Sequence, residues 1–161
     1  MSWTEIETQT LTTTAASVVF STGLSGYKFF RLTIYIVNDA NSKDVLLRLN
    51  NDSGTNYAYQ TILGNGGTII GGRATGQTSS SLTILDLGVS QAGSVSVLIA
   101  KPAAGVKAQV LSQSGVNTSP SLLLAGDEWD NTADLISRID VIASSNNFAA
   151  GTSILLEGLE F

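Results

Sequence analysis

A glycine-rich segment in the middle of the chain has the spacing of a phosphate-binding loop. Gly71, Gly76 and Thr78 occupy the fixed positions of the pattern G-x-x-x-x-G-x-T. Gln77 stands where such a loop needs the lysine that reaches the β- and γ-phosphates. The chain also lacks the alternation of strands and helices that would place the loop. We therefore interpret this segment as a glycine loop without nucleotide chemistry.

The main acidic cluster surrounds a tryptophan: Asp127, Glu128 and Asp130 flank Trp129. Paired carboxylates beside an aromatic ring could hydrolyse a glycosidic bond or bind calcium. A hydrolase would need two of them to face one another across a cleft, which neighbours on a turn rarely do. The cluster also lacks the regular ladder of a calcium loop, and Asn50 to Gly54 has the composition of an ordinary turn. We interpret both segments as solvated turns and predict no metal-binding residue.

The chain contains no histidine and no cysteine. This excludes a Ser-His-Asp triad, a cysteine nucleophile, disulfides and thiolate metal sites. Ser112 and Ser114 do not belong to a nucleophile elbow of the type G-x-S-x-G. The sequence therefore predicts a protein that is not an enzyme, with no catalytic residue and no cofactor.

The net charge is −5, and the eight basic residues are scattered along the chain. Nucleic-acid binding needs a concentrated positive surface, so we expect no direct contact with nucleic acid. The segment from Met1 to Ile6 lacks the regions of a secretory signal, and no apolar run approaches the roughly 20 residues of a membrane helix. We expect synthesis in the cytoplasm without membrane insertion. Few residues are charged, so the surface is suited to packing against a neighbour or against sugars.

Alternating apolar and polar residues predict a chain built from short strands. The clearest strand runs from Phe30 to Ile36, and Val45 to Leu49 repeats its pattern after a polar connection at 39–42. These two runs predict an antiparallel hairpin. A short helical turn is expected at 128–135. Further strands are expected at 8–21, 57–62, 68–70, 82–87, 94–100, 106–111, 119–124, 135–141 and 152–161.

About ten short strands with polar turns indicate an all-β fold, a two-sheet antiparallel β-sandwich that is jelly-roll-like. We expect one domain over residues 1–161. The Thr-rich segment 1–20 is expected to be an edge strand or an N-terminal arm that adds a strand to a neighbouring molecule.

Two segments carry a more specific pattern. In Trp129 to Phe161, the tryptophan is followed by Asn-Thr-Ala, an I-x-R-I-D strand, an N-F-A-A-G turn and a closing strand that ends in Gly-Leu. Tyr27 to Gln60 contains an aromatic-rich R-L-x-I-x strand, a polar turn and the run L-L-R-L-N-N-D-S-G-T-N-Y-A-Y-Q. Together these segments resemble the structural proteins of tailed-bacteriophage virions. Within that family such domains are parts of head decorations, head fibres and tail-tip or receptor-binding assemblies.

The resemblance implies a non-enzymatic virion protein, made in the host cytoplasm and then located in the particle. We expect a capsid decoration or head-fibre subunit that binds other virion proteins, major capsid or tail proteins, and stabilises the particle surface. A homotrimer is the expected oligomer. The alternative is a tail-tip or receptor-binding module that recognises a host-surface glycan.

Four aromatic residues are candidates for either contact, because an aromatic side chain combines a large area with a polar edge. They are Tyr57, Tyr59, Trp129 and Trp3. Tyr57 and Tyr59 are two residues apart in a predicted strand, so they are expected to share one face. We expect these rings to form an interface between subunits or a surface on which sugars stack, unless the sandwich buries them.

Overall fold

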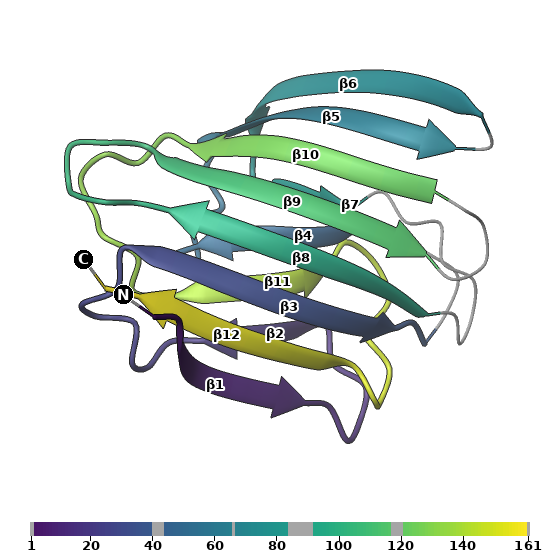
Figure 1. Ribbon diagram of the computed structural model, residues 1–161, viewed down its shortest axis with the longest axis horizontal. Coiled ribbons are helices and arrows are strands. Elements are labelled where there is room, and N and C mark those ends of the chain that lie inside the picture. Colours follow the sequence, from purple (N-terminus) through teal and green to yellow (C-terminus); the bar gives the residue numbers. More distant parts are fainter. Residues whose placement is uncertain (1, 40–43, 66, 84–91, 117–120, 161) are drawn as a thin grey trace.

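The computed structural model describes residues 2–39, 44–65, 67–83, 92–116 and 121–160, and these residues form twelve β-strands and no helix (Figure 1). The larger sheet contains β1 (Thr4–Thr10), β3 (Phe29–Val37), β5 (Tyr57–Asn65), β6 (Thr68–Gln77), β8 (Ala92–Ala100), β9 (Ala108–Val116), β10 (Ser121–Trp129) and β12 (Ser153–Leu159). The smaller sheet contains β2 (Ser17–Phe20), β4 (Val45–Leu49), β7 (Ser80–Thr83) and β11 (Ile139–Ala143). The predicted all-β sandwich is confirmed.

All strand pairs in both sheets are antiparallel. The larger sheet has the order β1-β12-β3-β8-β9-β10-β5-β6, and the smaller has the order β2-β11-β4-β7. The chain repeatedly crosses between the sheets, because each strand of the smaller sheet is followed by one or more strands of the larger. This alternation is jelly-roll-like, with β8, β9 and β10 forming a meander and β1 and β12 added beside β3.

The core lies between the two sheets. In β3, the side chains of Phe30, Leu32, Ile34 and Ile36 are fully buried, as their alternation predicts. In β4, Val45, Leu47 and Leu49 are buried in the same way. These two strands do not form the predicted hairpin, because β3 pairs with β8 and β12 whereas β4 pairs with β7 and β11. Their apolar faces belong to opposite sheets.

The Gly-rich segment was expected to be a loop with only a short strand, and this expectation is wrong. Residues 68–77 form the ten-residue edge strand β6, paired with β5. Gly76 has a φ of +65° at a register shift in this pairing, so its role is to form a β-bulge. Gly72 faces Thr61, and a Cβ at this position would lie 2.6 Å from the Thr61 hydroxyl oxygen. An extended strand does not cradle a phosphate as a loop does.

The expected helical turn at 128–135 is also wrong. Trp129 ends β10, and the following residues adopt irregular structure up to β11. Asn50, which has a φ of 55°, holds this segment with its side chain. Its amide nitrogen donates to the carbonyl of Leu135, and its amide oxygen accepts from the backbone N–H groups of Ser137 and Arg138. These bonds replace the backbone bonds that a helix would make.

Segment 1–20 contributes strands to both sheets. β1 is an edge strand of the larger sheet and pairs with β12, while β2 pairs with β11 in the smaller sheet. The edge-strand expectation therefore describes β1. Because Val18 and Phe20 in β2 are buried in the core, that part of the segment is not an arm that can leave the domain.

Two features of the C-terminal pattern have structural explanations. In the N-F-A-A-G turn, Phe148 is buried and exchanges backbone hydrogen bonds with Ala15, which ties the crossover from β11 to β12 to the N-terminal segment. In the closing strand, Gly158 lies under the ring of Tyr27, where an added Cβ would collide with the ring. Glycine is therefore required for this close approach.

Among the described residues, no helix is long and apolar enough to cross a membrane.

Candidate interaction surface

The outer side of the larger sheet, turned away from the smaller sheet, carries a group of exposed aliphatic side chains. They come from five adjacent strands, β8, β9, β10, β5 and β6. We call this group the outer apolar face. Its members are Ile62, Ile69, Leu98, Leu111, Leu122 and Leu124, which are between 39% and 79% exposed. Each lies at an outward position because side chains on a strand alternate between the two sides of the sheet.

Strand register places these side chains beside one another. Leu98 on β8 is directly opposite Leu111 on β9, and Leu124 on β10 is directly opposite Ile62 on β5. Leu98, Leu111 and Leu124 line one shallow hollow, and Leu111, Leu124 and Ile62 line the next. The two opposite pairs therefore form a connected band across the middle of the sheet.

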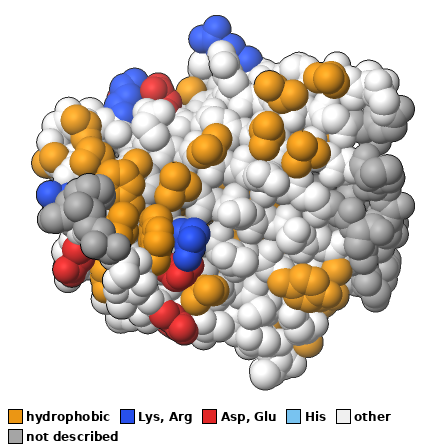
Figure 2. Space-filling view, in the orientation of Figure 1, with side chains coloured by type: hydrophobic (Ala, Val, Ile, Leu, Met, Phe, Trp, Pro, Cys, Tyr) orange, Lys and Arg blue, Asp and Glu red, His pale blue; other side chains and the backbone are white. Residues whose placement is uncertain are grey.

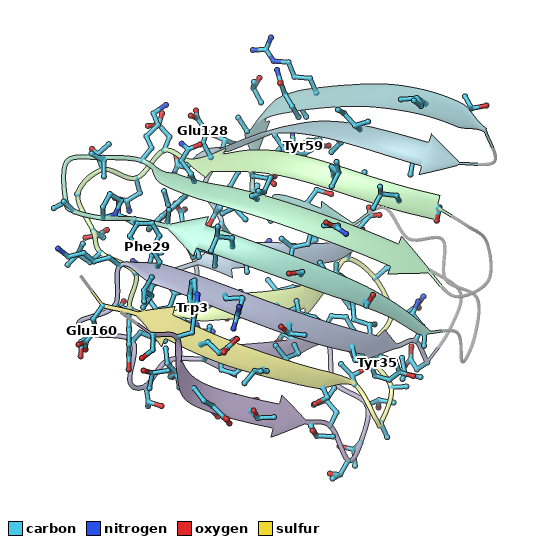
Figure 3. All side chains as sticks on the ribbon, viewed as in Figure 1. Trp3, Phe29, Tyr35, Tyr59, Glu128 and Glu160 are labelled. Carbon is cyan, nitrogen blue, oxygen red and sulfur yellow. The ribbon has the colours of Figure 1, made fainter. Side chains whose placement is uncertain are left out.

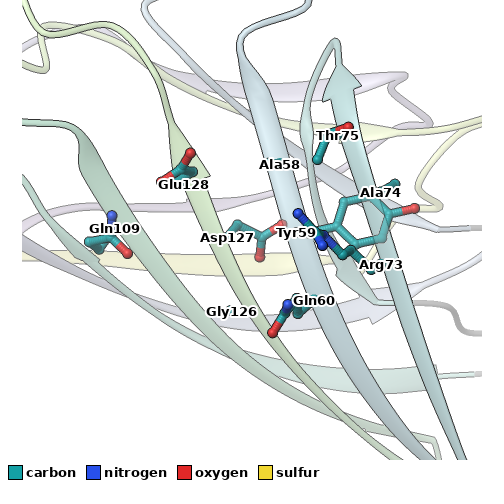
Figure 4. A pocket seen from close by; sticks show the side chains of 10 residues that line it. All are labelled: Ala58, Tyr59, Gln60, Arg73, Ala74, Thr75, Gln109, Gly126, Asp127 and Glu128. Carbon is teal, nitrogen blue, oxygen red and sulfur yellow. The ribbon is translucent and has the colours of Figure 1, made fainter.

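Glycines create a second feature of this surface, a pair of adjoining hollows. One has a volume of about 640 Å³ and has Gly71, Gly72 and Gly126 in its lining. The other has a volume of about 470 Å³ and a more polar lining, and we call it the polar hollow (Figure 4). Gln60, Arg73 and Gly126 border both. The lining residues of the second hollow are Ala58, Tyr59, Gln60, Arg73, Ala74, Thr75, Gln109, Gly126, Asp127 and Glu128.

Charged side chains lie around the outer apolar face rather than within it. Figure 2 shows hydrophobic side chains between uncharged polar ones, with the visible charged side chains toward the left half and the top of the view. Beyond Leu98, the next strand carries Arg31, which forms a two-pronged ion pair with Glu157 at 2.7 Å. Its hydrogen bonds to Glu157 raise the pKa of Arg31, and the guanidinium lowers the pKa of Glu157. Both groups therefore stay charged and paired.

Two of the four candidate aromatic residues lie in the core. The side chains of Tyr57 and Trp129 are fully buried, and their rings stack with centroids 6.5 Å apart. The Trp129 indole N–H donates to the carboxylate of Asp52 at 2.7 Å, and the Tyr57 hydroxyl accepts from the backbone N–H of Leu49. Burial raises the pKa of Tyr57 to about 12. Neither ring offers a face to a sugar or to another subunit.

The other two candidate residues are partly exposed and lie far apart. Tyr59 lines the polar hollow near the β6 edge of the larger sheet, whereas Trp3 lies near β12 and β3, toward the β1 edge (Figure 3). The ring of Trp3 is covered by the guanidinium of Arg31, 4.9 Å from the ring centroid. The four aromatic residues therefore do not form one stacking platform.

Asp127 and Glu128 belong to strand β10 and Asp130 directly follows it, so the cluster around Trp129 is not the solvated turn that we expected. Asp127 points inward and is buried, while Glu128 and Asp130 lie at the surface. The ammonium of Lys107 lies 2.9 Å from Glu128 and 3.3 Å from Asp130. Hydrogen bonds to these two carboxylates raise the pKa of Lys107. The cation occupies the position between them that a substrate or calcium would need, and no group of metal-binding side chains occurs among the described residues.

Asp127 is an unusual group for the inside of a sandwich. One carboxylate oxygen accepts from the backbone N–H of Ser81 at 3.3 Å, and the other has no hydrogen-bond partner among the described residues. The hydroxyls of Ser80 and Ser114 are likewise buried without a partner there. Burial raises the pKa of Asp127 to about 7. The carboxyl group of Asp127 therefore titrates near neutral pH.

Lys101 is almost fully buried, which no pattern in the sequence predicts. Its ammonium donates to the carbonyls of Val106 and Asn131, each at 2.6 Å, and lies 5.4 Å from the centroid of the Trp129 ring. Burial lowers the pKa of Lys101. The side chain ties the β8–β9 connection to the segment after β10. A lysine just beyond a strand carries no sign in the sequence that it will turn inward.

The turn from Asn50 to Gly54 supports the core through the side chain of Asp52. The Asp52 carboxylate accepts from the backbone N–H of Gly54, the side-chain amide of Asn56 and the Trp129 indole. These donors together lower its pKa, against the opposing effect of burial. Three donors already occupy the oxygens that a cation would need.

Comparisons with known proteins add no relative: no family model matches the chain, and no curated protein matches it.

Proposed function

We propose that this chain is a non-enzymatic structural protein of a tailed-bacteriophage virion. The observation that carries the proposal is the outer apolar face. Five adjacent strands expose six aliphatic side chains on one surface, together with glycine-lined hollows. A contiguous exposed apolar surface is typical of a protein–protein contact. The resemblance of Tyr27 to Gln60 and of Trp129 to Phe161 to phage structural proteins supports the same assignment.

Within the virion, we place the chain on the outside of the head, as a capsid decoration or head-fibre subunit. A compact sandwich that binds through a broad neutral surface is suited to bridging neighbouring capsid proteins, because it contributes contact area without a demanding arrangement of charges. A homotrimer is the oligomer that the resemblance favours. In this proposal its partners are other virion proteins, and it binds neither nucleic acid nor a membrane.

The stability of particles that lack the chain tests this proposal. We expect that deleting its gene from the phage gives heads that release DNA at a lower temperature than wild-type heads. Adding the purified chain back should restore the release temperature, because the bridging contacts form again. As a control, a chain heated until it is unfolded and aggregated should restore nothing. If particles that lack the chain release their DNA at the same temperature as wild-type particles, the chain has no decorating role.

A tail-tip module that recognises a glycan is the second candidate, and the polar hollow favours it. Amide groups of Gln60 and Gln109, the carboxylate of Glu128 and the guanidinium of Arg73 border this hollow beside Tyr59. Such groups can form hydrogen bonds with sugar hydroxyls while an aromatic residue contacts the ring.

On the glycan hypothesis, Tyr59→Ala should remove binding on a glycan array, because Tyr59 is the aromatic residue in the lining of the hollow. Tyr35→Ala is the matched control. Tyr35 is exposed on β3, away from the hollow (Figure 3), so its loss should leave glycan binding unchanged. A wild-type chain that binds no glycan on the array, or a Tyr59→Ala variant that binds as well as wild type, would end this hypothesis.

A further inference from the structure

We propose that a second copy of this chain covers the outer apolar face, which makes this surface a contact between subunits. This inference concerns how the chain associates with itself. It uses the surface that also supports the proposed virion function and assigns that surface to another copy of the chain, so contacts with capsid proteins fall to other surfaces. Three observations carry it: the exposure of the face, its charge and its size.

The first observation is the degree of exposure of the aliphatic side chains. Ile69 is 79% exposed and Leu111 is 58% exposed, although they belong to a sheet whose other side is well packed. The neighbouring members of the outer apolar face are also exposed, and they line connected hollows with Leu111. Scattered exposed aliphatic residues are ordinary, but a connected group on one flat surface indicates a buried state in an assembly.

The second observation concerns charge. The chain has a net charge of −5, so copies that approach through an average part of the surface repel one another. The outward positions described on β8 and β9 are uncharged: Ser94, Ser96, Leu98, Gln109, Leu111 and Gln113. Charged groups stand at its borders: Arg73 and Glu128 at one end of the five strands, and Arg31 on β3 beyond Leu98. A neutral central area allows two identical chains to meet, whereas a strongly basic or acidic partner would find little complementary charge there.

The third observation is size. Five strands of nine or ten residues form this area. Strand spacing and rise give the outer side of these strands about 24 Å by about 30 Å, or about 700 Å², including the end that carries Arg73 and Glu128. A stable pair of proteins buries about 800 Å² on each partner, so the area is close to what a specific contact between two copies needs.

The shape of the surface also suits a contact between subunits. Ile69 and Ile62 project from the hairpin of β5 and β6, while Gly71, Gly72 and Gly126 line a hollow of about 640 Å³ beside them. Two copies fit together when side chains that project from one surface enter a hollow of the other. The outer apolar face and the hollow beside it provide both features.

The test is the solution mass of the chain, measured by size-exclusion chromatography with light scattering at micromolar concentrations. We expect wild type to have the mass of two or more protomers of 16.8 kDa each. Leu111→Glu should reduce the mass to one protomer, because it places a charge in the middle of the contact. Leu135→Glu is the matched control: Leu135 is also 58% exposed but lies outside the outer apolar face, so this variant should keep the wild-type mass. Far-ultraviolet circular dichroism should show both variants folded.

Two results would overturn the inference. A wild-type chain with the mass of one protomer would show that copies do not associate. An oligomeric Leu111→Glu variant, with a mass equal to wild type, would show that they associate through another surface. Leu124→Lys provides an independent check with the opposite charge and should also give one protomer. A chain that associates in this way but is absent from phage particles would contradict only the virion proposal, and a monomer present in particles would contradict only this inference.

Discussion

Asp127→Asn is expected to make the protein more stable above neutral pH. Burial raises the pKa of Asp127 from 3.8 to about 7 in the fold, so the folded state favours the neutral carboxyl. The unfolded chain loses this proton at much lower pH. The stabilising contribution is therefore fully present below the unfolded pKa and is lost as the pH rises through about 7. Asparagine keeps an oxygen for the Ser81 N–H and never ionises.

The size of this effect follows from the difference between the two pKa values. About three pKa units at about 1.4 kcal/mol each give a penalty of at most about 4 kcal/mol for the ionised carboxylate. Urea unfolding at about pH 4 and about pH 9 gives the free energy of unfolding of wild type and variant at each pH. The variant should have the much larger free energy of unfolding at the higher pH. At the lower pH the two free energies should be similar, or wild type should have the larger one.

Glu128→Gln is the matched control for this prediction. It removes the carboxylate of the next residue, which lies at the surface beside Lys107. Because that group is solvated, the variant should follow wild type at both pH values. If Asp127→Asn also follows wild type at both, then the carboxyl of Asp127 reaches water or a partner in solution, and its assigned burial is wrong.

Trp129→Ala is expected to destabilise the fold by about 4 kcal/mol, within the range measured for loss of a buried aromatic side chain. The indole is fully buried between the ring of Tyr57 and the ammonium of Lys101. Its loss creates a cavity and removes one donor from the Asp52 carboxylate. Thermal and urea unfolding should both show the loss. Under the glycan hypothesis this variant would lose binding only because it loses the fold.

Trp3→Ala is the natural control, because Trp3 and Trp129 are the two tryptophans of the chain. Trp3 is half-buried at the surface and contacts Arg31. Removing its ring costs the cation–π contact, about 1 kcal/mol or less. Equal destabilisation by the two substitutions would contradict the assignment of Trp129 to the core.

The strands with one buried face were predictable because their side chains alternate. Phe30 to Ile36 and Val45 to Leu49 show this pattern clearly, and both are strands. Their partners were not predictable. The pattern states that each strand has an apolar face, but a polar connection at 39–42 fits a hairpin and a crossover between sheets equally well. The pairing is set by contacts between residues far apart in the chain, such as β3 with β8 and β12.

The strand β6 lacked any such signal. All its residues are exposed or half-exposed, so no alternation distinguishes them from a loop, and its glycines favoured the loop interpretation. The outer apolar face was missed for a related reason. Leu111, Leu122 and Leu124 look like ordinary core residues in the sequence, and only the strand register shows that they point away from the core.

Polar residues in the core were the hardest to predict. Asp127 and Lys101 belong to residue types that are almost always at the surface. Their burial depends on partners elsewhere in the chain: Ser81 on β7 for Asp127, and the carbonyls of Val106 and Asn131, in two connections between strands, for Lys101. The same holds for two of the aromatic candidates, Tyr57 and Tyr59. Tyr57 is buried and Tyr59 is half-exposed, and this difference depends on the packing of β5 with β10.

The most direct test of the proposed function is the protein composition of purified phage particles. Quantitative mass spectrometry of particles from the phage that encodes this chain should find it in many copies per particle. Gold-labelled antibodies against the chain should mark the head. If the chain is abundant in infected cells but absent from the purified particles, it is not a virion structural protein.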